Sequence, residues 1–218
     1  MYFKSRADAA GQLAQLIVPK YRYENCAVVA LSDGGVVIAS NIATQLHCVL
    51  MMLLTEQITL PGENSPVGSI DQSGGFTFNG MYSAGQLEEF ESEYRNNIEQ
   101  QKLEKIHSMN GLLGSGGIID ADLIRYHNVI LVSDGLSSGL SLDAAASYLK
   151  PYKLEKLIVA TPVASIGAVD RMHLLADEIF CLSVVENYIN TNHYYEDNTL
   201  PPHETIVKTI KDIVLKWQ

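Results

Sequence analysis

The sequence predicts an α/β protein whose mostly parallel β-sheet is flanked by helices. Short runs of apolar, β-branched residues alternate with segments of helical periodicity, which is the pattern of buried parallel strands and their crossover helices. Polar loops rich in glycine and serine follow two of these runs. With 47% hydrophobic and 18% charged residues, the 218 residues can bury one large core. We therefore expect a single domain over residues 1–218.

The first sixty residues predict a helix followed by a βαβ unit. Ser5 has the right side chain to cap the first helix, and Pro19 is expected to mark its end. The run CAVVAL is typical of a strand covered on both faces. The remaining elements of this region are expected to be a strand at 26–31, a loop at 32–35, a short helix at 36–46 and a second buried strand at 48–54.

The middle of the chain changes in character. Prolines, glycines and short alternating segments over 57–80 indicate loops and a hairpin outside the main sheet. Ser83 and Gln86 have the spacing of a capping box, and apolar residues on one face predict a long helix over 83–108. Its acidic residues are expected to form a solvated face. We expect residues 57–128 to form an insertion within the domain.

The alternation of strands and helices then returns. The expected elements are strands at 129–132, 156–163 and 178–184 and helices at 141–149, 166–176 and 202–217. Ligands of such sheets bind beyond the carboxyl ends of the strands. Two loops are therefore the candidate binding elements, 32–35 after the first strand of the βαβ unit and 133–141 after the strand at 129–132.

Composition and charge exclude several classes of protein. The formal charge of −10, with no cluster of lysine and arginine, argues against nucleic acid as a partner. No apolar run approaches the length that spans a bilayer, and the amino terminus lacks a signal-peptide core, so we expect no membrane partner. Cys26, Cys48 and Cys181 are too scattered for a disulfide framework or a metal knuckle. These features predict a cytoplasmic protein.

The loop at 133–141, which we call the serine loop, has the residue types of an anion site. Its glycines permit unusual backbone turns, and successive N–H groups at the start of the following helix can bind an anion. The hydroxyls of Ser137, Ser138 and Ser141 can donate to phosphate oxygens, and Asp134 can accept hydrogen bonds from sugar hydroxyls. No lysine follows Gly139, so this is not a Walker A loop. A phosphorylated ribose fits these residues; a plain strand-to-helix turn capped by Ser141 is the alternative.

The segment VILVSDGLSSGLSLDAAASYL resembles the phosphoribosyl pyrophosphate signature of type I phosphoribosyltransferases. The stretch from TPVASIGAVDR to NHYYEDN is similar to the carboxy-terminal part of a group of these enzymes with a Tyr-Glu-Asp element, and VVALSDGG to the group's opening. The resemblance implies the phosphoribosyltransferase fold, a small hood formed by 57–128, Mg²⁺ bound chiefly through the substrate's oxygens, and a role in nucleotide metabolism.

The resemblance also implies roles for single residues. Asp134 is the catalytic candidate and would hold the ribose hydroxyls, while Asp33, Gly34 and Gly35 would line the pyrophosphate side. Ser137, Ser138, Gly139 and Ser141 would surround the 5′-phosphate. The other residues of the loop expected to bind the substrate are Ser133, Gly135, Leu136 and Leu140. No protein residue is expected to bind the metal directly.

The sequence departs from the family pattern at two positions. Ser133 replaces the first acid of the acidic pair, and Asp33 stands where the family has a cation. Like charges a few ångström apart repel by roughly several kcal/mol in a partly desolvated site. We therefore expect a degenerate pyrophosphate site with weak or lost transferase activity, and the sequence does not decide between an enzyme and a binding protein.

Two other functions stay open at this point. Gly135 to Gly139 reads G-x-S-x-G, which would make Ser137 the nucleophile of a serine hydrolase, with His193 or His203 as the base. The carboxylate of Asp134 would then crowd the developing oxyanion, which argues against this function. A non-catalytic scaffold could instead use the acidic helix 83–108 as its interaction surface, including as the contact of a homodimer.

Overall fold

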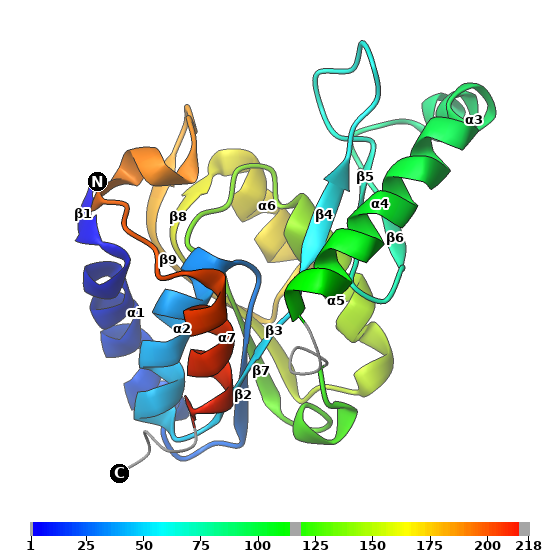
Figure 1. The fold of residues 1–218 in the computed structure, drawn as a ribbon. Helices are drawn as coiled ribbons and strands as arrows, with labels where there is room; N and C mark the ends of the chain where they lie inside the picture. Colours follow the sequence, from blue (N-terminus) through cyan, green and yellow to red (C-terminus); the bar gives the residue numbers. More distant parts are fainter. Residues whose placement is uncertain (1, 114–118, 214–218) are drawn as a thin grey trace.

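The structure is a computed structural model that describes residues 2–113 and 119–213 (Figure 1). Its strands are β1 (Phe3–Ser5), β2 (Cys26–Ala30), β3 (Val49–Met52), β4 (Thr55–Ile58), β5 (Gly68–Asp71), β6 (Phe76–Phe78), β7 (Asn128–Val132), β8 (Lys156–Ser165), β9 (Glu178–Val185) and β10 (Tyr195–Asp197). Its α-helices are α1 (Arg6–Tyr21), α2 (Asp33–Leu46), α3 (Ala84–Glu93), α4 (Arg95–Leu113), α5 (Leu140–Leu149), α6 (Ile166–Leu175) and α7 (His203–Lys211).

The main sheet has five strands within the described residues, all parallel, in the order β3-β2-β7-β8-β9. Every residue of β2 and of β7 is buried, as their apolar sequences predict. Ala30 pairs with Val132 where these two central strands end, so the loops that follow them start side by side. The predicted parallel α/β sheet is confirmed.

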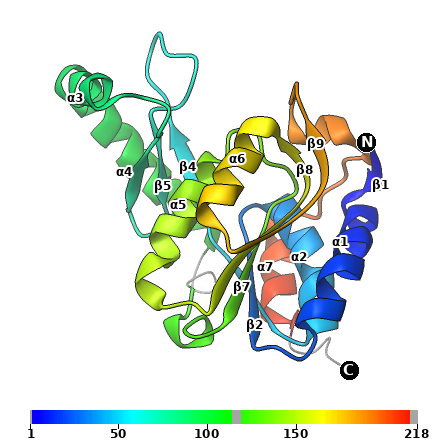
Figure 2. The ribbon, with the colours of Figure 1, turned by 180° about the vertical axis from the view of Figure 1, so that it is seen from behind.

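Helices cover both faces of this sheet (Figures 1 and 2). Helices α1, α2 and α7 pack on one face through residues such as Leu13, Ile42 and Ile206. Helices α5 and α6 pack on the other face through Leu142 and Met172. The two apolar layers hold the carboxyl ends of the strands in fixed positions, which is what a binding site at that edge requires.

Strands β4, β5 and β6 form a separate antiparallel sheet, which we call the small sheet. It stands to one side of the main sheet, and α4 runs across it (Figure 1). Ile58 and Ile70 pack against Ile98 and Met109 of α4 in a core of their own. The predicted hairpin excursion therefore does lie outside the main sheet, although β3 leads into it after only two residues.

Several local expectations are confirmed and others are wrong. Ser5 caps α1 through the backbone N–H of Asp8, and the Ser83–Gln86 capping box is formed. The helix predicted to end at Pro19 continues to Tyr21, because a proline in the last turn removes only one hydrogen bond.

The predicted long helix is broken at Tyr94, whose backbone leaves the helical region at φ −110° and ψ 16°. Apolar residues keep helical spacing across the break, so the pattern alone conceals it. Helix α2 begins at Asp33 rather than 36, which places 33–35 in its first turn instead of in a loop. Parts of the glycine-rich stretch 111–117 and of the last predicted helix, 202–217, lie outside the described residues.

Candidate functional site

A cavity of about 230 Å³ lies at the carboxyl ends of β2 and β7. It is the position expected for a ligand of a parallel sheet. The lining residues are Leu31, Ser32, Thr55, Gln57, Ser133, Asp134, Gly135, Leu136, Ser137, Ser138, Gly139, Ser141 and Thr191. Most of the serine loop thus borders one hollow, and the sequence analysis missed the contributions of Thr55, Gln57 and Thr191.

The backbone of the serine loop is fixed by its neighbours. Leu136 donates to the carbonyl of Val163 with an N···O distance of 3.0 Å, and its own carbonyl accepts from Ser165 at 2.9 Å. The hydroxyl of Ser165 donates to the carbonyl of Ser137. Gly139 takes φ 75° directly before α5, a conformation that favours glycine. The loop is therefore pinned at its middle and at its end.

The serine side chains of the loop differ in their surroundings. Ser133 is buried, and its Oγ donates to the carbonyl of Gly135 at 3.0 Å. Ser137 and Ser138 are exposed, and Ser141 is half-buried. Three hydroxyls beside the N-terminus of α5 can thus donate to an anion, where the helix dipole also favours negative charge.

Asp134 is buried at one side of the cavity, with 8% of the residue exposed. Its Oδ2 accepts from Arg6 Nε at 2.8 Å, and its Oδ1 accepts from the Ser32 hydroxyl at 2.7 Å. A buried carboxylate is tolerated when it is paired in this way. The Ser32 contact joins the ends of β2 and β7 through their side chains.

Arg6 is a further residue beside the cavity that was not predicted from the sequence. It is 4% exposed, its Nη2 donates to the side chain of Asn192 at 2.8 Å, and its Cζ lies 4.6 Å from the ring centroid of Tyr195. Within the described residues, its Nη1 is buried without a hydrogen-bond partner. The one sequence signal for the burial of Arg6 is that a charged residue stands among the apolar residues on the buried face of α1.

The carboxy-terminal segment reaches the same site because β10 pairs with β1 in parallel, with Phe3 opposite Tyr195. The Tyr195 hydroxyl donates to the backbone carbonyl of Asp134 at 2.5 Å. Burial, together with the Asp134 charge, raises the pKa of Tyr195 well above its ordinary value, so the phenol remains a donor. Arg6, Asp134 and Tyr195 form one buried network.

Asp33 faces His203 of α7 and does not line the cavity. Its two carboxylate oxygens lie 2.9 and 3.0 Å from Nδ1 of His203, and Nε2 of His203 lies 2.9 Å from the carbonyl of Leu112. Burial lowers the pKa of His203, but the Asp33 and Leu112 contacts outweigh it and the net shift is upward. Because both ring nitrogens face acceptors, the imidazolium form satisfies the geometry best.

Of the remaining predicted residues, only Leu136 belongs to the lining of the cavity. Gly34 and Gly35 are buried in the first turn of α2 and, like Asp33, do not belong to the lining set. Leu140 and Leu136 are each only 2% exposed, so their side chains serve the core. A Cβ on Gly34 would lie 2.0 Å from Asp134 Oδ2, so the absence of a side chain lets α2 approach the buried network.

The histidines considered for a hydrolase have other partners. His193 Nε2 lies 2.8 Å from the Tyr2 hydroxyl, and His203 contacts Asp33 and Leu112. Neither histidine has Ser137 as a hydrogen-bond partner in the described part of the chain.

Two properties of residues 2–113 and 119–213 bear on cofactors and membranes. These residues hold no group of three or more histidine, cysteine, aspartate or glutamate side chains that could bind a metal ion. They also hold no helix that is long and apolar enough to cross a bilayer.

A family model for the phosphoribosyl transferase domain matches residues 3–198. Two Mycobacterium tuberculosis proteins, from strains H37Rv and CDC 1551 and provisionally named phosphoribosyl transferases, are each 23% identical to this chain over 206 residues. The match covers 94% of this chain but 45% of each relative, so the chain spans about half of their length.

Solved structures share the fold. The protein TT1426 from Thermus thermophilus superposes with a TM-score of 0.73 at 24% identity, covering 96% of this chain and 98% of that one. A purine phosphoribosyltransferase from Pyrococcus horikoshii gives a TM-score of 0.50 at 11% identity, covering 92% of this chain and 98% of that one. At such identities the likeness establishes the fold, which is the one predicted from the sequence.

Proposed function

Because the chain belongs to the phosphoribosyl transferase family, we propose that its cavity binds a ribose 5-phosphate group, carried by phosphoribosyl pyrophosphate or a nucleoside monophosphate. The observation that carries this proposal is the serine loop. Its backbone is pinned, and Ser137, Ser138 and Ser141 line the cavity beside the start of α5. Donors fixed before the ligand arrives cost little reorganisation when an anion binds.

Asp134 is proposed to hold the ribose hydroxyls. A carboxylate offers about four lone-pair sites, and Arg6 and Ser32 use only one on each oxygen. Asp134 lines the cavity next to the serine loop. A negative charge at this position would also favour positive charge that develops at the anomeric carbon during transfer.

The pyrophosphate side is proposed to be altered. Asp33 occupies the first turn of α2, and its charge is balanced by His203 rather than by a ligand cation. As the family resemblance implies, Mg²⁺ would be held mainly through oxygens of the substrate. A pyrophosphate group would therefore find less attraction here than a 5′-phosphate finds at the serine loop, and transferase activity would be weak or lost.

Residues 57–128 are proposed to form the hood over the site, within one domain spanning 1–218. Thr55 and Gln57 of β4 line the cavity where the small sheet leaves the main sheet. A role in nucleotide metabolism in the cytoplasm follows from a phosphorylated ribose ligand and from three cysteines that are all free thiols.

Calorimetric titration tests the proposal. Ribose 5-phosphate, AMP and phosphoribosyl pyrophosphate, the last with Mg²⁺, are titrated into the protein. We expect binding of all three and a roughly tenfold loss for Ser141→Ala, because a hydrogen bond to a charged group is removed. Ser147→Ala, on an exposed position of the same helix, is the control and should bind as the parent does. If none of the three ligands gives binding heat at millimolar concentration, the proposal is refuted.

A further inference from the structure

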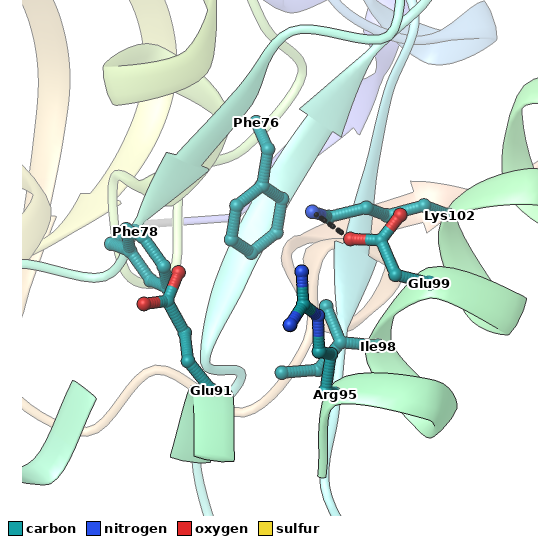
Figure 3. Close-up of a pocket in the computed structure, with 7 residues that line it drawn as sticks. All are labelled: Phe76, Phe78, Glu91, Arg95, Ile98, Glu99 and Lys102. Atoms are coloured by element: carbon teal, nitrogen blue, oxygen red, sulfur yellow. Dashed lines mark hydrogen bonds and ion pairs between the residues drawn. The ribbon is translucent and has the colours of Figure 1, made fainter. Parts of the chain in front are cut away.

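A second cavity, of about 290 Å³, lies between the small sheet and the helix pair α3 and α4 (Figure 3). We call it the aromatic pocket. Its lining residues are Phe76, Phe78, Glu91, Arg95, Ile98, Glu99 and Lys102. It combines two aromatic rings with four charged side chains, which is an unusual mixture for a surface that only packs.

The aromatic pocket is separate from the proposed ribose phosphate site. In an antiparallel sheet, paired residues share a face and their chain neighbours point to the other face. Glu56 pairs with Ile70, and Ile70 with Phe76, so these three lie on the α4 face of the small sheet. Thr55 and Gln57, which line the first cavity, lie on the opposite face. A ligand in one cavity therefore does not touch the other.

The two phenylalanines form an aromatic corner. Their ring centroids are 4.9 Å apart, with the planes at 82°. Lys102 Nζ lies 4.3 Å from the centroid of the Phe76 ring and also donates to Glu99 Oε1 at 2.8 Å. The hydrogen bond and the charge of Lys102 lower the pKa of Glu99, and the charge of Arg95 lowers it further. Lys102 and Glu99 thus neutralise each other and complete the wall.

Two charges of opposite sign remain. Within residues 2–113 and 119–213, neither the Glu91 carboxylate nor the Arg95 guanidinium makes a hydrogen bond or an ion pair. Both side chains extend from the helices toward the two rings (Figure 3). Residues four apart normally meet on a helix, but here the helix breaks between them at Tyr94. In this part of the chain, the break leaves a cation and an anion available beside the aromatic corner.

We propose that the aromatic pocket binds a free α-amino acid with an aromatic side chain. The carboxylate would pair with the guanidinium fork of Arg95, the ammonium with Glu91, and the side chain would lie against Phe76 and Phe78. This ligand uses each group that the pocket leaves unmatched. A simple anion would be repelled by Glu91 and a simple cation by Arg95, so a zwitterion is preferred over both.

The cavity volume supports a ligand of this size. At 290 Å³ it lies at the lower end of the range for small-molecule sites, roughly 300–1,000 Å³. A single amino acid is a ligand of correspondingly small size. Because the aromatic pocket lies within residues 57–128, a bound amino acid would contact the proposed hood. This holds whether or not the first cavity binds a phosphorylated ribose.

Calorimetry with defined probes tests this proposal. L-Phenylalanine is titrated first, followed by 3-phenylpropanoate, which lacks the ammonium group, and phenethylamine, which lacks the carboxylate. We expect L-phenylalanine to bind at least about tenfold more tightly than either analogue, because each lost charged contact costs about that factor. Equal affinity for the three probes, or no binding of L-phenylalanine at millimolar concentration, would overturn the proposal.

Variants locate the binding site. Arg95→Gln and Glu91→Gln should each weaken L-phenylalanine binding about tenfold, and Phe78→Ala should weaken all three probes. Glu89→Gln removes the same charge from the same helix outside the lining set and should leave the affinity unchanged. Since Glu91 and Arg95 are exposed, the Glu91→Gln and Arg95→Gln variants should have the same thermal unfolding midpoint as the parent protein. Unchanged affinity in both would place the ligand elsewhere and refute the site.

Discussion

The tripeptide Ser-Asp-Gly occurs at the ends of two neighbouring strands, at 32–34 after β2 and at 133–135 after β7, with different structural outcomes. The first copy enters a helix at once, with Ser32 as N-cap and Asp33 in the first turn of α2. The second leads into the serine loop before α5 begins at Leu140. The same three residues thus make a helix start in one place and one wall of a cavity in the other.

The partners of the two aspartates explain much of the difference. Asp33 is half-exposed and faces His203 of α7, while Asp134 is buried and faces Arg6 of α1. Each partner lies more than a hundred residues away, so the local sequence does not choose it. A partner that stays charged permits burial, whereas a titrating partner suits a position near solvent. The contrast predicts that the two aspartates differ in energetic weight and in their response to pH.

The largest expected effect is from removing the partner of Asp134. Arg6→Met leaves a buried carboxylate without its cation, which costs about 3–5 kcal/mol in the free energy of unfolding. Urea denaturation measures the loss. Lys20→Met is the matched control, since its ion pair with Glu178 has a 55% exposed lysine and should contribute no more than about 1 kcal/mol. Equal losses for the two variants would show that burial does not set the energetic weight of these ion pairs, and the contrast drawn between Asp134 and Asp33 would lose its basis.

An intermediate effect is expected where α2 approaches the buried network. In Gly34→Ala the new Cβ would lie 2.0 Å from Asp134 Oδ2 and 2.7 Å from Arg6 Nε, so the ion pair must shift. We expect a loss of about 1–3 kcal/mol. Gly11→Ala serves as the control, because its Cβ meets no atom within 4 Å and alanine favours the helix by about 0.5–1 kcal/mol. If Gly34→Ala left the free energy of unfolding unchanged, the start of α2 would not be packed against Asp134 and Arg6 as tightly as the structure shows.

Much of the fold could be predicted from the sequence because it depends on local patterns. The apolar runs at 26–31 and 129–132 are typical of strands buried on both faces, and the glycines and serines that follow them indicate loops. The position of the candidate site follows from the parallel sheet alone. The sequence could therefore predict that the serine loop lies at the binding edge of the sheet.

What could not be predicted depends on contacts between distant segments. Arg6 meets Asp134 only because α1 packs beside the ends of β2 and β7, and Tyr195 joins them only through the pairing of β1 with β10. Single-sequence periodicity carries no information on such pairings. The charge of Asp33 is evident from the sequence, but its partner His203 belongs to α7, which packs on α2 in the folded protein.

The smallest predicted effect concerns pH at the Asp33 site. The folded-state pKa of His203 is raised, because its contacts with Asp33 and Leu112 outweigh desolvation. The pair therefore stabilises the fold fully below the unfolded pKa of about 6.5, and this contribution is lost as pH rises through the folded pKa. We expect at most about 1 kcal/mol, since the pair is partly exposed.

Urea unfolding of the parent and of His203→Gln, at intervals between about pH 5.5 and 8.5, isolates this contribution. The difference in unfolding free energy between the two proteins should be largest at the acidic end and should shrink toward the alkaline end. Asp33→Asn removes the same pair from the other side and should give the same pH-dependent difference. Arg6→Met should differ from the parent by a nearly constant amount over this range, because arginine stays charged throughout it. A constant difference for His203→Gln would mean that Asp33 and His203 do not form an ion pair, and the contrast between the two Ser-Asp-Gly copies would then rest on burial alone.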